Sequence, residues 1–358
     1  MRVLLLGPSK SIHIQKWARF YKNQGIDIKI VTFYDHFQKD DFSLEIDILV
    51  LPKILPGKLS YITGVMPLKK YLKDFKPDIL HAHYASSYGF VGALTSFKPY
   101  YVSVWGRDVF QFPLENSINE KIIKFTFFMA DEICSTSHIM AEETRKYTDK
   151  TIHVTPFGVD LEKFKPIPGL REENVLTIGT VKALTDKYGI GDLIKAFALI
   201  SKKKENVRLL IVGDGPQRDE YQRLARDLGV ADLVSFAGRI PNDEVPRYIN
   251  KMDVFCVPST EDSESFGVAA VESMACGVPV VVSNVGGLPE VVVENETGFI
   301  VPKENPEQLA KAVIHLLENA ELRNKMGQNG IVHVKKNYNW IENAKGMLKL
   351  YEQTLRGV

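Results

Sequence analysis

Two kinds of hydrophobic pattern alternate along the chain. Residues 2–6 form a short apolar run that ends at Gly7-Pro8, and residues 12–25 then carry large apolar side chains at helical spacing. Residues 27–34 follow as an apolar run of the kind that is buried in a parallel sheet after a crossover helix. This order predicts the start of a doubly wound α/β domain.

The alternation continues, breaks once and then restarts. Residues 165–169 contain two prolines and a glycine, which is typical of a linker, and a fresh apolar strand follows at 174–181. We therefore predict an α/β protein with two Rossmann-like domains, residues 1–165 and 170–338, followed by a terminal helix within 339–358. Further strands are predicted at 46–52, 78–84 and 100–105, and further helices at 64–75, 117–130, 306–318, 321–336 and 340–355.

The charge balance argues against a nucleic-acid partner. The 358 residues carry 45 Lys and Arg against 44 Asp and Glu, so no global positive field exists. The charge is uneven, however, because residues 1–168 hold 22 basic and 18 acidic side chains, and the helix predicted at 64–75 contains Lys69, Lys70 and Lys73. An anionic membrane surface, if it is a partner, would meet the first domain.

The cysteines and the apolar runs indicate a cytoplasmic protein. Cys134, Cys256 and Cys276 are odd in number and form no CxxC pair, as expected of buried thiols in a reducing compartment. Only about four apolar residues precede Gly7, too few for a signal-peptide core, and no run reaches the roughly 18 residues of a membrane span.

The most informative stretch is the loop and helix at residues 258–273. A strand ends at Pro258, a polar loop follows, and Gly267 opens a helix whose free amides face the carboxyl edge of the sheet, where ligands bind in doubly wound folds. Glu264 and Glu272 are placed to accept hydrogen bonds from sugar hydroxyls. The structural alternative, a capping role for Glu264 and Ser265 and a solvated position for Glu272, is equally compatible with the pattern.

Lys182 and Lys187 follow the strand at 174–181. Two cations at the end of a parallel strand would face a diphosphate and stabilise it as it departs, although two solvated loop lysines would give the same pattern. The Gly213-Asp214-Gly215 turn lacks the third glycine of a dinucleotide fingerprint, which disfavours a nicotinamide enzyme. Gly7 can let backbone approach a phosphate.

Two histidines mark the end of the strand at 78–84. His81 and His83 share one face, but no third ligand is in evidence, so packing or substrate contact is favoured over a metal. Trp105 and Asp108 follow the next strand and lie at the same edge of the predicted sheet.

Taken together, these residues resemble the retaining glycosyltransferases of family four, a group 1 family with the GT-B architecture of two Rossmann-like domains and an interdomain cleft. The resemblance is most specific in PSTEDSESFGVAAVESMACGVPVVVSNVGGLPEVV followed by GFIVP, with seven residues between Glu264 and Glu272. It is supported by HAHY, TPFGVDLEKFKP, IGTVKALTDKYGI, VGDGP and FAGRIP, and it spans nearly the whole chain.

The resemblance implies a site in which no metal and no tightly bound cofactor takes part. Lys182, Lys187 and Glu264 would act on the diphosphate and the donor sugar. Donor binding would further involve Gly7, the main chain at Arg239 and Ile240, Ser265, the amides of Phe266 and Gly267, and Glu272 at the ribose. The terminal helix would cross back onto the first domain.

Two positions depart from the family pattern. Lys182 stands where the family often has Arg, so the diphosphate would be held by a point charge rather than a fork. Trp105 stands where a histidine usually lies near the transferred sugar, which makes His83, Trp105 and Asp108 the candidates on the acceptor side.

The implied activity is that of a hexosyltransferase that uses a UDP- or GDP-sugar. It would move the sugar, with retention of configuration, to a hydroxyl of a glycan or lipid-linked acceptor, as in bacterial or archaeal cell-surface polysaccharide synthesis. Two alternatives stay open: a GT-B sugar-nucleotide epimerase, and a noncatalytic glycosyltransferase-like partner subunit.

Overall fold

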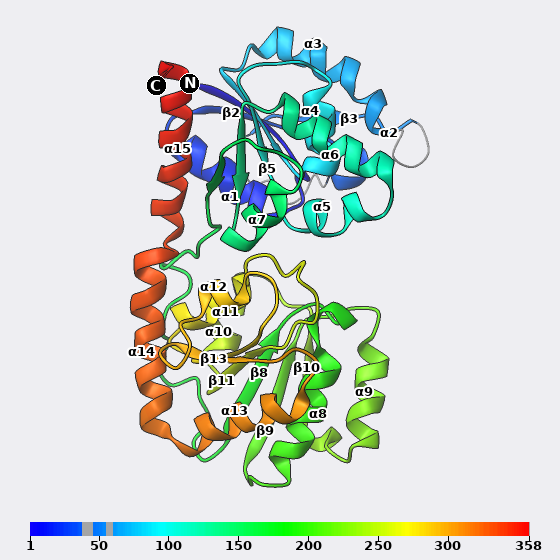
Figure 1. Ribbon diagram of the computed structural model, residues 1–358. Helices are drawn as coiled ribbons and strands as arrows, with labels where there is room; N and C mark the ends of the chain where they lie inside the picture. The colour runs from blue at the N-terminus through cyan, green and yellow to red at the C-terminus, as the bar shows by residue number, and fades with distance from the viewer. Residues whose placement is uncertain (38–45, 55–59, 358) are drawn as a thin grey trace. The chain divides into compact units, whose positions relative to one another are not determined.

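The computed structural model describes residues 1–37, 46–54 and 60–357 and divides the chain into two compact units (Figure 1). The first unit comprises Met1–Pro156 with Ile341–Val358, and the second comprises Phe157–Trp340. Each unit is built on one all-parallel sheet, as the alternation of strand and helix patterns predicted.

The first unit holds a seven-stranded sheet in the order β3-β2-β1-β4-β5-β6-β7. Its strands are β1 (Arg2–Leu6), β2 (Asp27–Phe33), β3 (Ile48–Leu51), β4 (Ile79–His83), β5 (Tyr100–Ser103), β6 (Glu132–Ser135) and β7 (Ile152–Val154). Its helices are α1 (Ile12–Asn23), α2 (Ser60–Thr63), α3 (Val65–Phe75), α4 (Phe90–Ala93), α5 (Arg107–Phe110), α6 (Ser117–Met129), α7 (His138–Arg145) and the last helix, α15 (Trp340–Arg356).

Side chains alternate between the two faces of this sheet, as the pleat of a strand requires. Leu4 and Leu6 of β1 belong to a buried core that includes Leu68 of α3, Val91 of α4 and Ile123 of α6. The opposite face meets α1 and the terminal helix. Both sides of the sheet are therefore covered, which explains why its strands read as nearly continuous apolar runs.

The terminal helix α15 packs on the first unit through buried tyrosine contacts. The Tyr351 hydroxyl contacts His81 Nδ1 of β4 and also receives a hydrogen bond of 3.1 Å from the Tyr21 hydroxyl of α1. His81 Nε2 lies 2.8 Å from the Ser103 hydroxyl, so both ring nitrogens of this buried histidine have partners. His81 is thus a packing residue that ties the end of the chain to the central strands.

The second unit holds a six-stranded sheet in the order β10-β9-β8-β11-β12-β13. Its strands are β8 (Leu176–Val181), β9 (Val207–Val212), β10 (Val234–Gly238), β11 (Val254–Val257), β12 (Val280–Ser283) and β13 (Gly298–Val301). Its helices are α8 (Ile190–Ser201), α9 (Arg218–Asp227), α10 (Val245–Ile249), α11 (Val268–Ala275), α12 (Leu288–Val291), α13 (Pro306–Glu318) and α14 (Ala320–Asn337).

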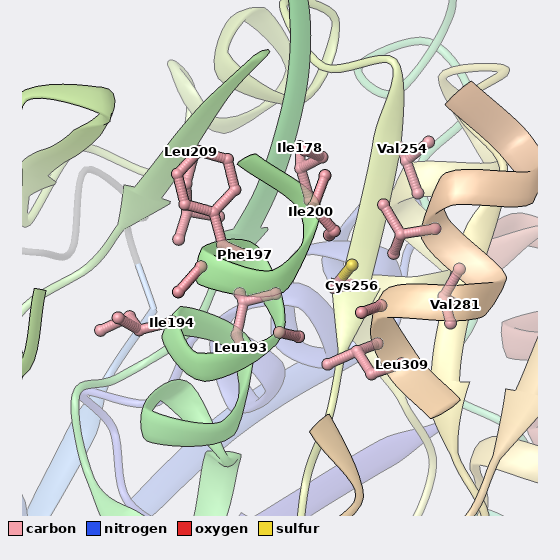
Figure 2. Close-up of a cluster of buried hydrophobic side chains, with 14 of the residues drawn as sticks. Ile178, Leu193, Ile194, Phe197, Ile200, Leu209, Val254, Cys256, Val281 and Leu309 are labelled. Atoms are coloured by element: carbon pink, nitrogen blue, oxygen red, sulfur yellow. The ribbon is translucent and has the colours of Figure 1, made fainter. Parts of the chain in front are cut away.

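The core of this unit is formed where α8 and α13 lie on the central strands. Figure 2 shows side chains of α8, including Phe197, gathered against β8, β9 and β11, with Leu309 of α13 on the same side. The exposed fraction of each of these side chains is 2% or less. Dense packing of this kind fixes the strand ends from which the functional loops start.

The division between the units falls between Pro156 and Phe157, earlier in the chain than the proline-rich segment at 165–169. That segment is attached to the second unit, because the Ile167 amide donates to Asn250 Oδ1 and Asn250 Nδ2 donates to the Lys165 carbonyl. Residues 165–169, whose composition is typical of a linker, therefore form a short loop on the surface of the second unit. Within the described ranges, no helix has the length and apolar character that a membrane span requires.

Candidate active site

The second sheet reverses its strand order between β8 and β11. Successive strands build outward from β8 to β9 and β10, and then return to the other side of β8 with β11. The loops that leave the carboxyl ends of β8 and β11 consequently run side by side, which is the usual ligand position in an open α/β sheet. Lys182 and Lys187 lie on the first of these loops and Glu264 on the second.

Lys182 and Glu264 form a buried ion pair. Lys182 Nζ lies 2.7 Å from Glu264 Oε2, and the two side chains are 11% and 9% exposed. The Ser259 hydroxyl donates a hydrogen bond of 3.3 Å to the same carboxylate oxygen. Burial by itself raises the pKa of Glu264, but the charge and the hydrogen bond of Lys182, with smaller contributions from Lys187 and Ser259, bring the pKa below its usual value. Glu264 is therefore ionised at neutral pH.

Lys187 belongs to the same cluster. Its Nζ donates to the Ser263 carbonyl at 3.0 Å, and its own carbonyl accepts a hydrogen bond of 2.8 Å from the Thr260 amide. The ring of Tyr188 lies between the two lysines, with its centroid 4.7 Å from Lys182 Nζ and 5.4 Å from Lys187 Nζ. Two ammonium groups are thus held beside one buried carboxylate, which favours an anionic ligand.

Two glycines let neighbouring backbone approach this cluster. A Cβ at Gly213, where φ is +134°, would lie 1.9 Å from the Lys182 carbonyl oxygen. A Cβ at Gly286, where φ is +50°, would lie 2.2 Å from the Glu264 carbonyl oxygen. The Gly213-Asp214-Gly215 segment therefore acts as a tight turn that supports the Lys182 loop, rather than as a dinucleotide fingerprint.

Helix α11 begins directly after Phe266 and Gly267, whose amides are expected from the sequence to bind the donor. Phe266 is buried, with its ring 6.1 Å from that of Phe157 and 5.6 Å from that of Tyr338. Within the part of the chain that the structure describes, the amides of Phe266 and Gly267 donate no hydrogen bond. Ser265 is buried beside them, and Glu272 is half-buried further along the helix. Unused amides at a helix start suit an anion.

Arg239 and Ile240 lie at the end of β10, the edge strand of this sheet. Arg239 is exposed and Ile240 is half-buried. They follow Gly238, whose carbonyl accepts a hydrogen bond of 2.9 Å from the Gly213 amide. The 239–240 segment, the glycine turn, the Lys182 loop and the Glu264 loop thus follow one another along a single edge of the second unit.

The remaining predicted residues lie in the first unit, at the ends of β1, β4 and β5. Gly7 is packed against α1, because a Cβ there would lie 2.5 Å from Ile14 Cδ1. His83 is 1% exposed, its ring stacks on that of His81 with centroids 4.3 Å apart, and among the described residues its two nitrogens have no hydrogen-bond partner. The Trp105 ring packs against the rings of His83 and His13, with centroids 5.4 Å and 5.6 Å away.

Backbone amides donate hydrogen bonds to the side chain of Asp108. Its carboxylate accepts hydrogen bonds from the amides of Ala85 at 2.8 Å, Trp105 at 3.0 Å and Gly106 at 2.9 Å. Burial raises the pKa of Asp108 above its usual value, although these amide contacts oppose that rise. In this geometry Asp108 holds the loops after β4 and β5 together and positions Trp105.

Sequence reasoning missed the residues that support the cluster. Ser259 and Tyr188 contact Glu264 and the two lysines, and Gly286 allows the β12 loop to press on the Glu264 loop. The one signal in the sequence that could have pointed to these supporting residues is that Tyr188 directly follows Lys187. The described residues contain no group of three or more His, Cys, Asp or Glu side chains placed to hold a metal.

Comparisons with known proteins agree on one family. Residues 162–333 match the model described as glycosyl transferases group 1, and residues 2–137 match the model described as glycosyl transferase 4-like. An uncharacterized glycosyltransferase of Methanocaldococcus jannaschii is 28% identical over 350 residues, which cover 96% of this chain and 94% of that protein.

Two further proteins illustrate the range of the family. A mannosyltransferase of Mycobacterium tuberculosis, described as GDP-mannose-dependent and acting on phosphatidylinositol monomannoside, is 33% identical over 203 residues, which cover 53% of each chain. HepE of Anabaena, solved in complex with UDP, has a TM-score of 0.83 with 19% identity, over 99% of this chain and 100% of that one. With both halves matched in order and the GT-B fold shared, the chain belongs to the group 1 glycosyltransferases.

Proposed function

We propose that this protein is a retaining, metal-independent hexosyltransferase that moves a sugar from a nucleoside diphosphate to a hydroxyl of a glycan or lipid-linked acceptor. The observation that carries the proposal is the cluster of Lys182, Lys187 and Glu264 at the strand-order reversal of the second sheet. Two fixed ammonium groups and unused helix amides supply what a leaving diphosphate requires.

The chemistry follows from these groups. The bond between the sugar C1 and the diphosphate oxygen breaks, and the acceptor hydroxyl oxygen attacks C1 on the same face. The departing diphosphate takes the hydroxyl proton, while Lys182 and Lys187 stabilise the negative charge that develops on it. Glu264, held ionised by Lys182, accepts hydrogen bonds from hydroxyls of the donor sugar. No side-chain nucleophile is needed.

The donor is a UDP- or GDP-sugar, since one relative is described as GDP-mannose-dependent and a structural neighbour was solved with UDP. We expect Glu272 to bind the ribose hydroxyls. Glu272→Ala should therefore weaken nucleotide-sugar binding by roughly ten- to hundredfold, the range expected for lost hydrogen bonds to a charged group.

Calorimetric titration of a panel of UDP- and GDP-sugars in the presence of EDTA measures this effect. Glu173→Ala, an exposed glutamate of the same unit, is the matched control and should bind as the wild type does. If Glu272→Ala and the wild type bind the nucleotide sugars with equal affinity, Glu272 does not contribute to donor binding.

We further propose that the first unit contacts an anionic membrane surface through α3. Lys69, Lys70 and Lys73 are exposed on this helix, and Met66 is 73% exposed beside them. A row of cations next to exposed apolar side chains is the composition of a helix that lies on a charged interface. Such contact would bring a lipid-linked acceptor to the enzyme.

Lys70→Glu combined with Lys73→Glu should then lower co-sedimentation with phosphatidylserine-containing vesicles by about tenfold or more, since each basic residue near such a surface contributes about 1 kcal/mol. Lys311→Glu with Lys325→Glu, exposed on α13 and α14, changes the net charge equally and should have no such effect. The membrane proposal fails if both double variants sediment alike.

A further inference from the structure

Tyr188 is held in place between the core of the second unit and the loop after β11. It ends a short 3-10 turn (Asp186–Tyr188), and its amide donates a hydrogen bond of 3.1 Å to the Thr185 carbonyl. The next residue, Gly189, has a φ of +64°, and a Cβ there would lie 1.8 Å from the carbonyl oxygen of Pro258, just after β11. The Tyr188 ring packs against the buried core of this unit. Backbone and ring are therefore fixed together.

The ammonium groups of Lys182 and Lys187 both lie over this ring. Lys182 Nζ is 4.7 Å from the ring centroid and Lys187 Nζ is 5.4 Å from it. Burial raises the pKa of the Tyr188 hydroxyl above its usual value, although the charge of Lys182 opposes that rise. The ring therefore meets both cations as a neutral phenol, and it attracts them through the negative face of its π system.

The ring contact differs in kind from the oxygen contacts of the two lysines. Lys182 Nζ donates to the Glu264 carboxylate and Lys187 Nζ donates to the Ser263 carbonyl. Like charges in one partly buried site repel each other, and a carboxylate offsets this repulsion. An oxygen partner, however, competes with phosphate oxygens for the same N–H groups, whereas the ring face offers no lone pair. The ring contact is thus the one that both lysines can keep while their N–H groups turn to a diphosphate.

We propose that Tyr188 is a positioning residue for the leaving diphosphate: attraction to its ring face keeps Lys182 and Lys187 together where negative charge develops during transfer. The proposal rests on the proposed transferase function and deepens it, because it names the residue that sets how the two cations meet the donor. It follows that the electronic character of the ring, beyond its size, controls diphosphate binding and the transfer rate.

The test replaces residue 188 of the full chain by phenylalanine and by phenylalanines that carry one, two or three ring fluorines. Each fluorine weakens the attraction of the ring face for a cation, while the size of the ring changes little. The affinity for UDP and GDP is measured by calorimetry, and the rate of sugar transfer is measured with the nucleotide sugar that binds best.

Both quantities should fall stepwise with each fluorine. With three fluorines they should lie about tenfold or more below those of Tyr188→Phe, because two cation–ring contacts weaken together. The affinity for uridine and guanosine, which lack the diphosphate, should stay constant across the series. Tyr188→Leu removes the ring and should cause a loss of at least the same size, most of which Tyr188→Phe should restore. Thermal unfolding of each variant measures whether the chain is folded.

Tyr248 provides the matched control. Its ring lies 4.7 Å from Lys251 Nζ in the same unit, the distance that separates Lys182 Nζ from the Tyr188 ring. The same fluorine series at position 248 should change neither the diphosphate affinity nor the transfer rate.

A flat fluorine series at position 188, or an equal fall at position 248, overturns the inference. Failure of the proposed function looks different. A wild-type chain that binds UDP or GDP but transfers no sugar contradicts that function, while the affinity series still decides the role of Tyr188. A wild-type chain that binds neither nucleotide overturns both.

Discussion

Lys182→Met is expected to lower the rate of sugar transfer by about 100- to 1,000-fold, the loss typical of removing one preorganised group that stabilises a developing oxyanion. The methionine keeps the length and apolar character of the side chain but carries no charge. The change also leaves the Glu264 carboxylate buried without its ion pair, which should cost about 3–5 kcal/mol of folding free energy. The transfer rate and urea unfolding measure the two effects separately.

A double variant separates catalysis from stability. Lys182→Met with Glu264→Gln removes both charges, so most of the lost stability should return, whereas the transfer rate should stay low. If the double variant regains both stability and activity, the ion pair is structural and Lys182 has no part in stabilising the leaving group.

Gly286→Ala is expected to have the second-largest effect. The new Cβ would lie 2.2 Å from the Glu264 carbonyl oxygen, a distance that no real contact permits, and φ at this position is +50°. Strain in the left-handed region costs about 1–2 kcal/mol and overpacking about 1–3 kcal/mol, so the loop that carries Glu264 must move. We expect lowered thermal stability together with at least about tenfold weaker nucleotide-sugar binding.

Gly229→Ala is the matched control for this effect. Gly229 has a φ of +70°, but a Cβ there would have nothing within 4 Å. This variant should share the conformational strain without displacing the Glu264 loop, so its donor affinity should equal that of the wild type. Equal donor affinity in Gly286→Ala would show that the loop position does not control donor binding.

The sequence predicted helices correctly where buried apolar side chains recur with a clear helical period. The helices expected at 64–75 and 117–130 are found as α3 (Val65–Phe75) and α6 (Ser117–Met129), because each has a continuous apolar stripe. The short helices α7 and α12 were not predicted. Their eight and four residues are too few to establish a helical period.

The chemistry of single residues was harder to predict from the sequence. Lys182 and Glu264 are 82 positions apart, and only the strand-order reversal brings them together. His81 and His83 look alike in the sequence, yet His81 is satisfied by Tyr351 near the end of the chain, while His83 is held by ring contacts alone among the described residues. Side-chain partners from distant elements leave no local signal.

The anomeric configuration of the product tests the central claim most directly. The wild-type chain is incubated in EDTA with the nucleotide sugar that binds best and with an acceptor, and the product's anomeric proton coupling is measured by nuclear magnetic resonance. We predict transfer without added metal and a product with the same anomeric configuration as the donor. An inverted product, a requirement for a divalent metal, or a new epimer formed from the donor alone would contradict it.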